Sequence, residues 1–184
     1  MTGRTLLLGA ALALLAMACS VRLAEKKLPP NVCRLPSTRE VLVSPDAAVN
    51  WLEPTVWAFE EWQSHVPGLR FNVIVSNHAR DAVLDACETS IVPYDFISPE
   101  YEGITHAHTR TGVIRVARNP LLMTLESRKA CMLHELGHLL FGFGHTTDMS
   151  SIMFPVIQAL PALSASDIAS ARTAFALDRD GAIS

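Results

Sequence analysis

The stretch HELGHLLFGFGH, residues 134–145, contains three histidines and decides how the rest of the chain is interpreted. The segment from Thr124 to Leu140 has no proline and one glycine, Gly137, so we predict a helix there. His134 and His138 are four residues apart, and side chains at that spacing lie one turn apart on the same face of a helix. Both imidazoles can therefore bind one metal ion; two solvated or hydrogen-bonded histidines are the alternative.

Glu135 follows the first histidine, and a side chain one residue further along a helix points about 100° around the axis. That offset keeps the carboxylate out of a ligand position and near a metal-bound water, where it can act as the general base. Catalytic zinc needs three protein ligands and one open position. No glutamate occurs after Leu139, which excludes a downstream glutamate as the third ligand. His145, the only histidine after His138, is our predicted third ligand, with Asp148 as the alternative.

These residues, followed by SIMFP at 151–155, resemble the metzincin clan and, within it, the matrixins. The resemblance implies an α+β fold, a metzincin-like zincin domain with a twisted mixed β-sheet packed on an active-site helix, and a C-terminal helix. It also implies that Met153 forms an apolar floor beneath the metal. Leu163–Ile168 resembles the start of the matrixin C-terminal helix, with Ser164 and Asp167 spaced as a capping box.

The connection between His138 and His145 is one residue longer here than in matrixins. Gly142 keeps the matrixin spacing to the third histidine, so we expect the extra residue in the helix, at or near Phe141. An added helical residue rotates the chain that follows by about 100°. We expect a π-type bulge to absorb this residue, because such bulges occur inside α-helices at functional sites.

The residues predicted to bind substrate are Val113, Ile114, Arg115, Pro155 and Val156. The first three lie in Gly112–Ala117, which resembles the edge strand where an extended substrate adds as a further strand through main-chain hydrogen bonds. The last two follow the methionine-containing turn, and by resemblance they wall the pocket for the residue after the scissile bond.

Alternating apolar patterns predict strands at Glu40–Val43 and Arg70–Ser76, and a hairpin over Ile104–Ala117 that turns at Thr109–Gly112. The three tryptophans of Asp46–Val66 have helical spacing, and Pro54 is expected to restart or kink that helix. Residues 77–102 follow neither pattern and are left unassigned.

The N-terminal region has the composition of an export signal. Thr5–Ala18 is apolar and uncharged, is too short to span a bilayer, and precedes Cys19. We therefore expect a signal peptide at 1–18, a lipidated or flexible tether at 19–32, and a zinc metallopeptidase domain at 33–184. The protein would be a cell-envelope lipoprotein anchored at Cys19, with secreted or periplasmic protein as the alternative.

The size and charge of the chain limit its partners. At 184 residues the chain suits one folded domain, and a net charge of −3 without a Lys/Arg-rich block argues against nucleic-acid binding. We expect a monomer that acts on protein or peptide substrates and meets a membrane only through a lipid at Cys19.

Three cysteines follow Cys19, which allows one internal disulfide in an oxidising compartment. We expect Cys33 to pair with Cys87, and Cys131 to be a buried packing thiol; a thiol at Cys33 that masks the zinc of a precursor is a weaker hypothesis. The residues considered for an accessory metal are His78, Asp85, His106 and His108, with solvated histidines as the alternative.

The expected activity is metal-assisted hydrolysis of a peptide bond. Zinc lowers the pKa of its bound water and polarises the scissile carbonyl, while Glu135 takes the proton and passes it to the leaving amine. Two alternatives use the same fold without catalysis. They are a zinc-binding envelope lipoprotein whose geometry the extra residue has spoiled, and an interaction module in which a fourth protein ligand closes the metal site.

Overall fold

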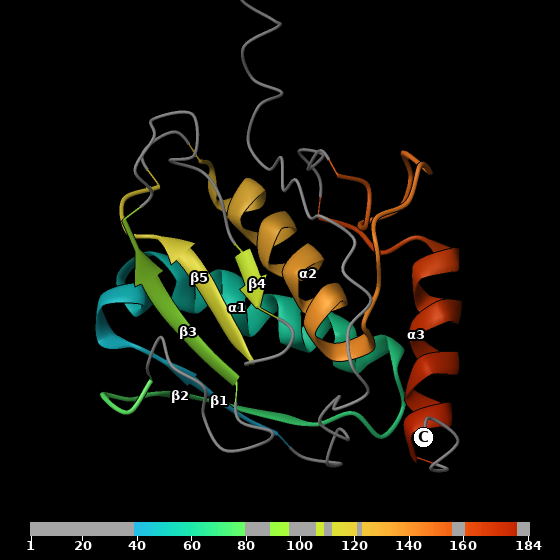
Figure 1. The fold of residues 1–184 in the computed structure, drawn as a ribbon, viewed down its shortest axis with the longest axis horizontal. Coiled ribbons are helices and arrows are strands. Elements are labelled where there is room, and N and C mark those ends of the chain that lie inside the picture. The colour runs from blue at the N-terminus through green and yellow to red at the C-terminus, as the bar shows by residue number, and fades with distance from the viewer. Residues whose placement is uncertain are drawn as a thin grey trace, which may run out of the picture.

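The computed structural model describes residues 39–79, 89–95, 106–108, 112–120, 123–155 and 161–179 (Figure 1). In chain order the elements are β1 (Arg39–Val43), α1 (Pro45–His65), β2 (Phe71–Val75), β3 (Thr89–Tyr94), β4 (His106–His108), β5 (Val113–Ala117), α2 (Leu125–Phe141) and α3 (Ala165–Arg179). In this described part no helix is both long enough and apolar enough to cross a membrane.

The strands form one twisted sheet in the order β2-β1-β3-β5-β4. The first four strands of that order are mutually parallel, and β4 is antiparallel to β5. Figure 1 shows α1 passing behind the sheet, α2 next to it, and α3 at the far end of the molecule. The predicted α+β fold, with a mixed sheet packed on the helix that carries His134 and His138 and with a C-terminal helix, is confirmed.

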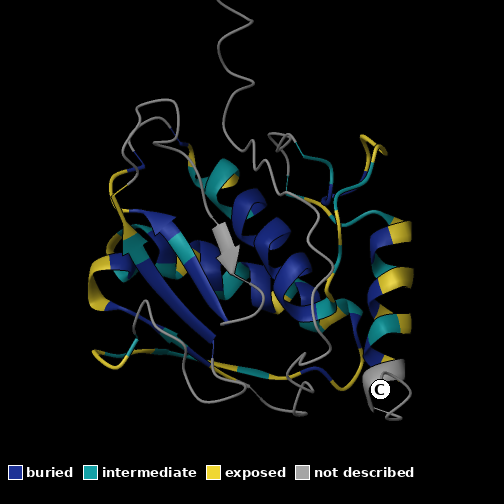
Figure 2. Ribbon diagram, viewed as in Figure 1, coloured by how far each residue is buried: buried dark blue, intermediate teal, exposed yellow. Residues whose placement is uncertain are grey.

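The core lies where alternate residues of the central strands meet α1 and α2. The strand residues of this core include Val41, Val43, Ile91, Ile114 and Val116, all of them fully or almost fully buried. Figure 2 shows that α2 is buried along most of its length, whereas α3 alternates between buried and exposed positions. Because α2 crosses the core, its side chains are held by packing on several sides.

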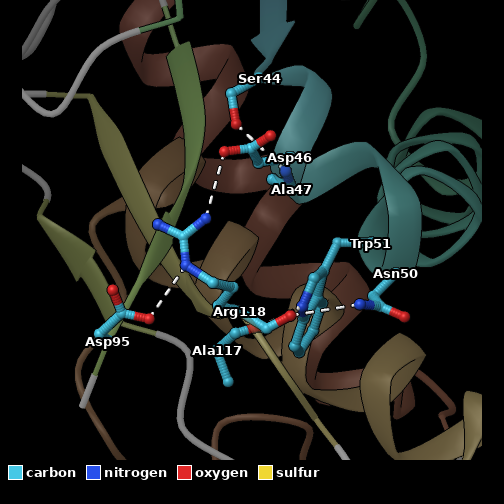
Figure 3. A network of polar contacts seen from close by, with 8 residues as sticks. All are labelled: Ser44, Asp46, Ala47, Asn50, Trp51, Asp95, Ala117 and Arg118. Atoms are coloured by element: carbon cyan, nitrogen blue, oxygen red, sulfur yellow. Dashed lines mark hydrogen bonds and ion pairs between the residues drawn. The ribbon is translucent and has the colours of Figure 1, made fainter. Parts of the chain in front are cut away.

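A polar network joins the start of α1 to the carboxyl ends of β3 and β5 (Figure 3). The indole Nε1 of Trp51 donates to the carbonyl of Ala117 at 2.8 Å in the interior. Outside it, the guanidinium of Arg118 bonds Asp46 at 3.1 Å and Asp95 at 3.0 Å. Exposed ion pairs contribute little to stability, so the buried indole bond is the stronger link between α1 and the sheet.

The predicted restart of the helix at Pro54 is wrong, since α1 continues through Pro54 as one helix, and the kink stays a prediction. A proline has no N–H, so in a helix it leaves the carbonyl four residues earlier without a partner. Here that carbonyl belongs to Asn50, and the Nη1 of Arg128 on α2 donates to it at 2.6 Å. A side chain from the neighbouring helix thus replaces the missing backbone bond.

The prediction that Gly112–Ala117 forms the edge strand is also wrong. Strand β5 lies between β3 and β4, and β4 is the edge strand of the described sheet. Four of the five β5 side chains are buried, which is typical of a strand with neighbours on both sides. The predicted hairpin is confirmed by the antiparallel pairing of His108 with Val113. Strand β3 lies within residues 77–102, which the sequence analysis did not assign.

Arg128→Met should lower the free energy of unfolding by about 1 kcal/mol, because it leaves the half-buried carbonyl of Asn50 without its donor. In a Pro54→Ala background the new N–H of residue 54 can bond that carbonyl, so Arg128→Met should then cost clearly less. Urea unfolding of the wild type, both single variants and the double variant measures the coupling. An equal cost in both backgrounds would contradict this account of Pro54.

Candidate metal centre

Helix α2 carries two of the predicted ligands and has defined caps at both ends. Its N-cap is Thr124, whose hydroxyl accepts a hydrogen bond from the N–H of Ser127 at 3.1 Å. Its C-cap is Gly142, which has a left-handed φ of 66°. Such a φ favours glycine because it has no Cβ. The last two turns, which carry His134 and His138, are therefore fixed by the core and by the helix end.

The structure brings the three predicted histidine ligands together. The Nε2 atoms of His134 and His138 are 3.0 Å apart, and the Nε2 of His145 lies 3.2 Å from the first and 3.3 Å from the second. Zinc bound tetrahedrally at about 2.0–2.1 Å from each nitrogen would need nitrogens about 3.3 Å apart. The triangle fits such an ion with little adjustment.

The alternative ligand Asp148 has other partners. Its carboxylate accepts hydrogen bonds from the N–H of Ser150 at 2.9 Å and from the hydroxyl of the same residue at 2.7 Å. In the described part of the chain, the cluster able to hold a metal consists of the three histidines without this aspartate. His145 is thus the third residue that the fold supplies.

Backbone carbonyls fix the tautomers of the two helical histidines. The Nδ1 of His134 is 2.6 Å from the carbonyl oxygen of Ile152, and the Nδ1 of His138 is 2.6 Å from that of Phe143. A carbonyl only accepts, so each Nδ1 carries the hydrogen and each Nε2 presents a lone pair. Two lone pairs facing each other at 3.0 Å repel unless a cation lies between them. The donor set therefore suits a metal ion.

Burial favours the neutral form of two of the three histidines. It lowers the pKa of His134 to about 3, and the neighbouring His138 lowers that pKa further in the same direction, although the bond to Ile152 opposes the shift. Burial also lowers the pKa of His145. Since only neutral imidazole binds a metal, these two side chains are ready to do so near neutral pH.

The extra residue between the second and third histidines is absorbed at the end of α2. The N–H of Gly142 lies between two carbonyls, that of His138, its α-helical partner, and that of Gly137, its π-type partner. The N–H of Phe143 also reaches the carbonyl of Gly137, at 3.3 Å. This closure is one residue wider than a Schellman cap. The predicted location near Phe141 agrees, but α2 remains α-helical to its end, so a widened cap takes the place of the expected internal bulge.

Met153 packs directly against the metal-binding helix. A Cβ at position 137 would collide with the sulfur of Met153, so Gly137 provides the space that this side chain needs. The carbonyl of Met153 accepts a hydrogen bond from the N–H of Thr146 at 3.1 Å. That bond holds the chain immediately after His145. The turn around Met153 thus contacts both parts of the chain that carry the histidines.

Asp167 has a second role that the sequence analysis did not predict. The expected capping box is present, because the N–H of Asp167 donates to the hydroxyl of Ser164 at 3.2 Å. Its buried carboxylate also accepts from the hydroxyl of Ser151 at 2.5 Å and from the N–H of Ile152 at 3.0 Å. The carbonyl of Ile152 in turn orients His134. Helix α3 is thereby linked to the metal centre, and the signal available in the sequence was a hydroxyl residue in an otherwise apolar turn.

The predicted substrate-binding residues have different environments. Val113 and Ile114 are buried, and with Arg115 they form the part of β5 that pairs with strands on both sides, so their backbone cannot pair with a substrate. The guanidinium of Arg115 lies over the ring of Tyr94, 5.2 Å from its centroid. Pro155 is half-buried after the methionine turn.

Other predicted residues fall partly outside the described structure. Glu135 is buried on α2, Cys131 is buried as predicted, and His78 is exposed. Val156, Cys19, Cys33, Asp85 and Cys87 lie outside the described residues, as do the side chains of His106 and His108. The accessory metal and the disulfide therefore stay predictions.

Asp167→Asn should weaken zinc binding by about 10–100-fold, because an amide cannot accept at both positions and the carbonyl that orients His134 loses its support. The matched control is Asp148→Asn, a carboxylate in the same region that bonds Ser150 in an exposed loop. Competition with a chromophoric chelator measures both affinities. Equal affinities in the two variants would show that Asp167 does not support the site.

Comparisons with known proteins agree with this geometry. The model of the matrixin family matches residues 43–176, a range that runs from the end of β1 into α3 and contains the histidine cluster and Asp167. A search of curated proteins found no match. The matched range covers most of the 184 residues. The chain therefore belongs to the matrixin family of metallopeptidases.

Proposed function

We propose that the protein is a zinc endopeptidase in which Glu135 is the general base and His134, His138 and His145 hold the metal. The observation that carries the proposal is the triangle of three Nε2 atoms, 3.0–3.3 Å apart. Two backbone carbonyls orient His134 and His138 so that the Nε2 lone pairs of these two residues point into the triangle. Three imidazoles on one side of an ion suit zinc and leave one coordination position for water.

The number of ligands favours catalysis over a structural metal. Structural zinc sites fill all four positions with protein ligands, whereas catalytic sites use three. Within the described residues the cluster contains three ligands and includes neither Asp148 nor Cys131. This supports a peptidase over the interaction module in which the metal only ties the helix to the following loop.

Glu135 supplies the proton transfer in the proposed reaction. Zinc, when bound, would act as a Lewis acid and lower the pKa of a coordinated water towards neutrality. The Glu135 carboxylate takes the proton from the attacking water and gives it to the leaving amine. Its place next to His134 on a buried helix fixes its position before substrate binds. The backbone carbonyls of Ile152 and Phe143 keep the two neighbouring imidazoles from turning.

The proposed substrate is an extended peptide that lies along β4. Within the described sheet β4 pairs with β5 alone, so its outer side can accept a further strand. This replaces β5, whose central residues have partners on both sides. Peptide substrates agree with the metallopeptidase family of the chain.

We also propose, from the sequence, that the protein is an exported monomer with lipid attached to Cys19, free secretion being the alternative. The apolar run before Cys19 supports export. Intact mass spectrometry of the protein from its native cells tests the anchor. A mature chain that begins at Cys19 and carries acyl groups is expected, and an unmodified N-terminal cysteine would show ordinary secretion.

Glu135→Gln should keep full zinc content and lower peptide hydrolysis by about 10²–10⁴-fold, because it removes the general base and leaves the ligands in place. His145→Ala should lose most of its zinc. The control is Glu126→Gln, an exposed carboxylate in the first turn of the same helix, which should remain fully active. Elemental analysis and cleavage of a quenched fluorescent peptide library measure the two effects.

Three results would contradict the proposal. Full hydrolysis by Glu135→Gln would exclude Glu135 as the base. Zinc retained equally in the wild type and in His145→Ala would place the third ligand elsewhere. A wild-type protein that binds one zinc and cleaves nothing would favour a binding module on the matrixin fold.

A further inference from the structure

Three aromatic side chains pack together beside the end of α2, and we call Trp62, Phe141 and Phe143 the aromatic cluster. The ring centroid of Trp62 is 4.9 Å from that of Phe141 and 6.4 Å from that of Phe143, and the two phenylalanines are 5.2 Å apart. Trp62 is fully buried on α1, while the phenylalanines are half-buried. Such edge-to-face and tilted arrangements favour one relative orientation of the rings.

The aromatic cluster contacts the backbone that carries the metal ligands at two places. The indole Nε1 of Trp62 donates to the carbonyl of Leu133, the residue before His134, at 3.2 Å. The carbonyl of Phe143 accepts the hydrogen of His138 Nδ1 at 2.6 Å. The ring of Phe143 lies 3.6 Å from where a Cβ on Gly137 would be, close against the helix between the two histidines.

The connection to His145 needs side-chain packing to hold it. Gly142 and Gly144 are exposed, and a Cβ at either position would meet nothing within 4 Å among the described atoms. Glycines lose more conformational freedom on ordering than other residues. In this connection the side chains of Phe141 and Phe143 lie in the aromatic cluster.

We infer that Phe141 and Phe143 are positioning residues of the metal centre. Phe141 is the last residue of α2, and its ring packs on Trp62, so it anchors the widened cap. Phe143 then sets the carbonyl that fixes the tautomer of His138. The inference rests on the proposed zinc site, and it assigns the geometry of that site to side chains that offer no ligand atom to the metal.

The chain offers a matched control for the loss of an aromatic side chain. Phe71 on β2 is half-buried like Phe141, and its centroid lies 4.3 Å from that of Phe59 on α1. Strand β2 is at the opposite edge of the sheet from β4. Phe71→Ala should therefore lower the free energy of unfolding about as much as Phe141→Ala does. The side chain that it removes lies at the edge of the sheet opposite β4.

The test compares Phe141→Ala, Phe143→Ala and Phe71→Ala in three measurements. These are urea unfolding, zinc affinity by chelator competition, and the visible absorption of the Co(II)-loaded protein, which reports coordination geometry. The Phe141 and Phe143 variants should bind zinc about 10–100-fold more weakly than wild type and change the Co(II) spectrum. Phe71→Ala should keep wild-type affinity and spectrum. Phe141→Tyr, which retains the aromatic ring, should have the zinc affinity and the Co(II) spectrum of the wild type.

The outcomes separate this inference from the proposed function. If the Phe141 and Phe143 variants keep the affinity and spectrum of Phe71→Ala, the rings are ordinary core and the inference is overturned. If the wild type binds no zinc, or His145→Ala binds it equally well, the zinc site itself fails. Should Phe143→Ala not fold, Phe143→Leu gives the same comparison, with weaker zinc binding expected.

Discussion

The hydrogen bond from His134 to the carbonyl of Ile152 ties the metal centre to the rest of the chain. The bond orients the imidazole only if Ile152 is held in place. The buried carboxylate of Asp167 holds Ile152 by accepting a hydrogen bond from its backbone N–H. Three successive segments, α2, the methionine turn and α3, are thus linked through Ile152 to one imidazole. A fold arranged in this way can keep its ligands oriented before a metal arrives, because their orientation depends on backbone carbonyls.

Placing this site on a buried helix has an energetic consequence. Burial keeps His134 neutral, so an acidic medium must both protonate the ligand and open the core around it. The same packing brings Met153 into contact with Gly137, which lies between the two helical histidines. The metal centre and the hydrophobic core are therefore parts of one packed unit, so a loss of order in one would disturb the packing of the other.

The sequence predicted what depends on local spacing. Helix α2, the face shared by His134 and His138, and the return of the chain to His145 follow from residues close together, and the structure has all three. Strand β5 was misplaced because its apolar residues look the same at an edge and in the interior, and only the pairing of β4 distinguishes them. The second role of Asp167 needs contacts between α3 and the methionine turn, which local patterns do not contain.

The proline in α1 illustrates how a missing group can specify an arrangement. A helix whose carbonyls are all bonded internally offers its neighbour few polar groups to bond, and apolar contacts tolerate several sliding or rotated placements. Pro54 leaves the carbonyl of Asn50 free to accept from Arg128 of α2, and the indole of Trp62 bonds the carbonyl of Leu133 between the same two helices. A proline, which usually breaks a helix, thus creates a polar contact between α1 and α2. This contact helps to fix the register of the two helices on which the histidine geometry is built.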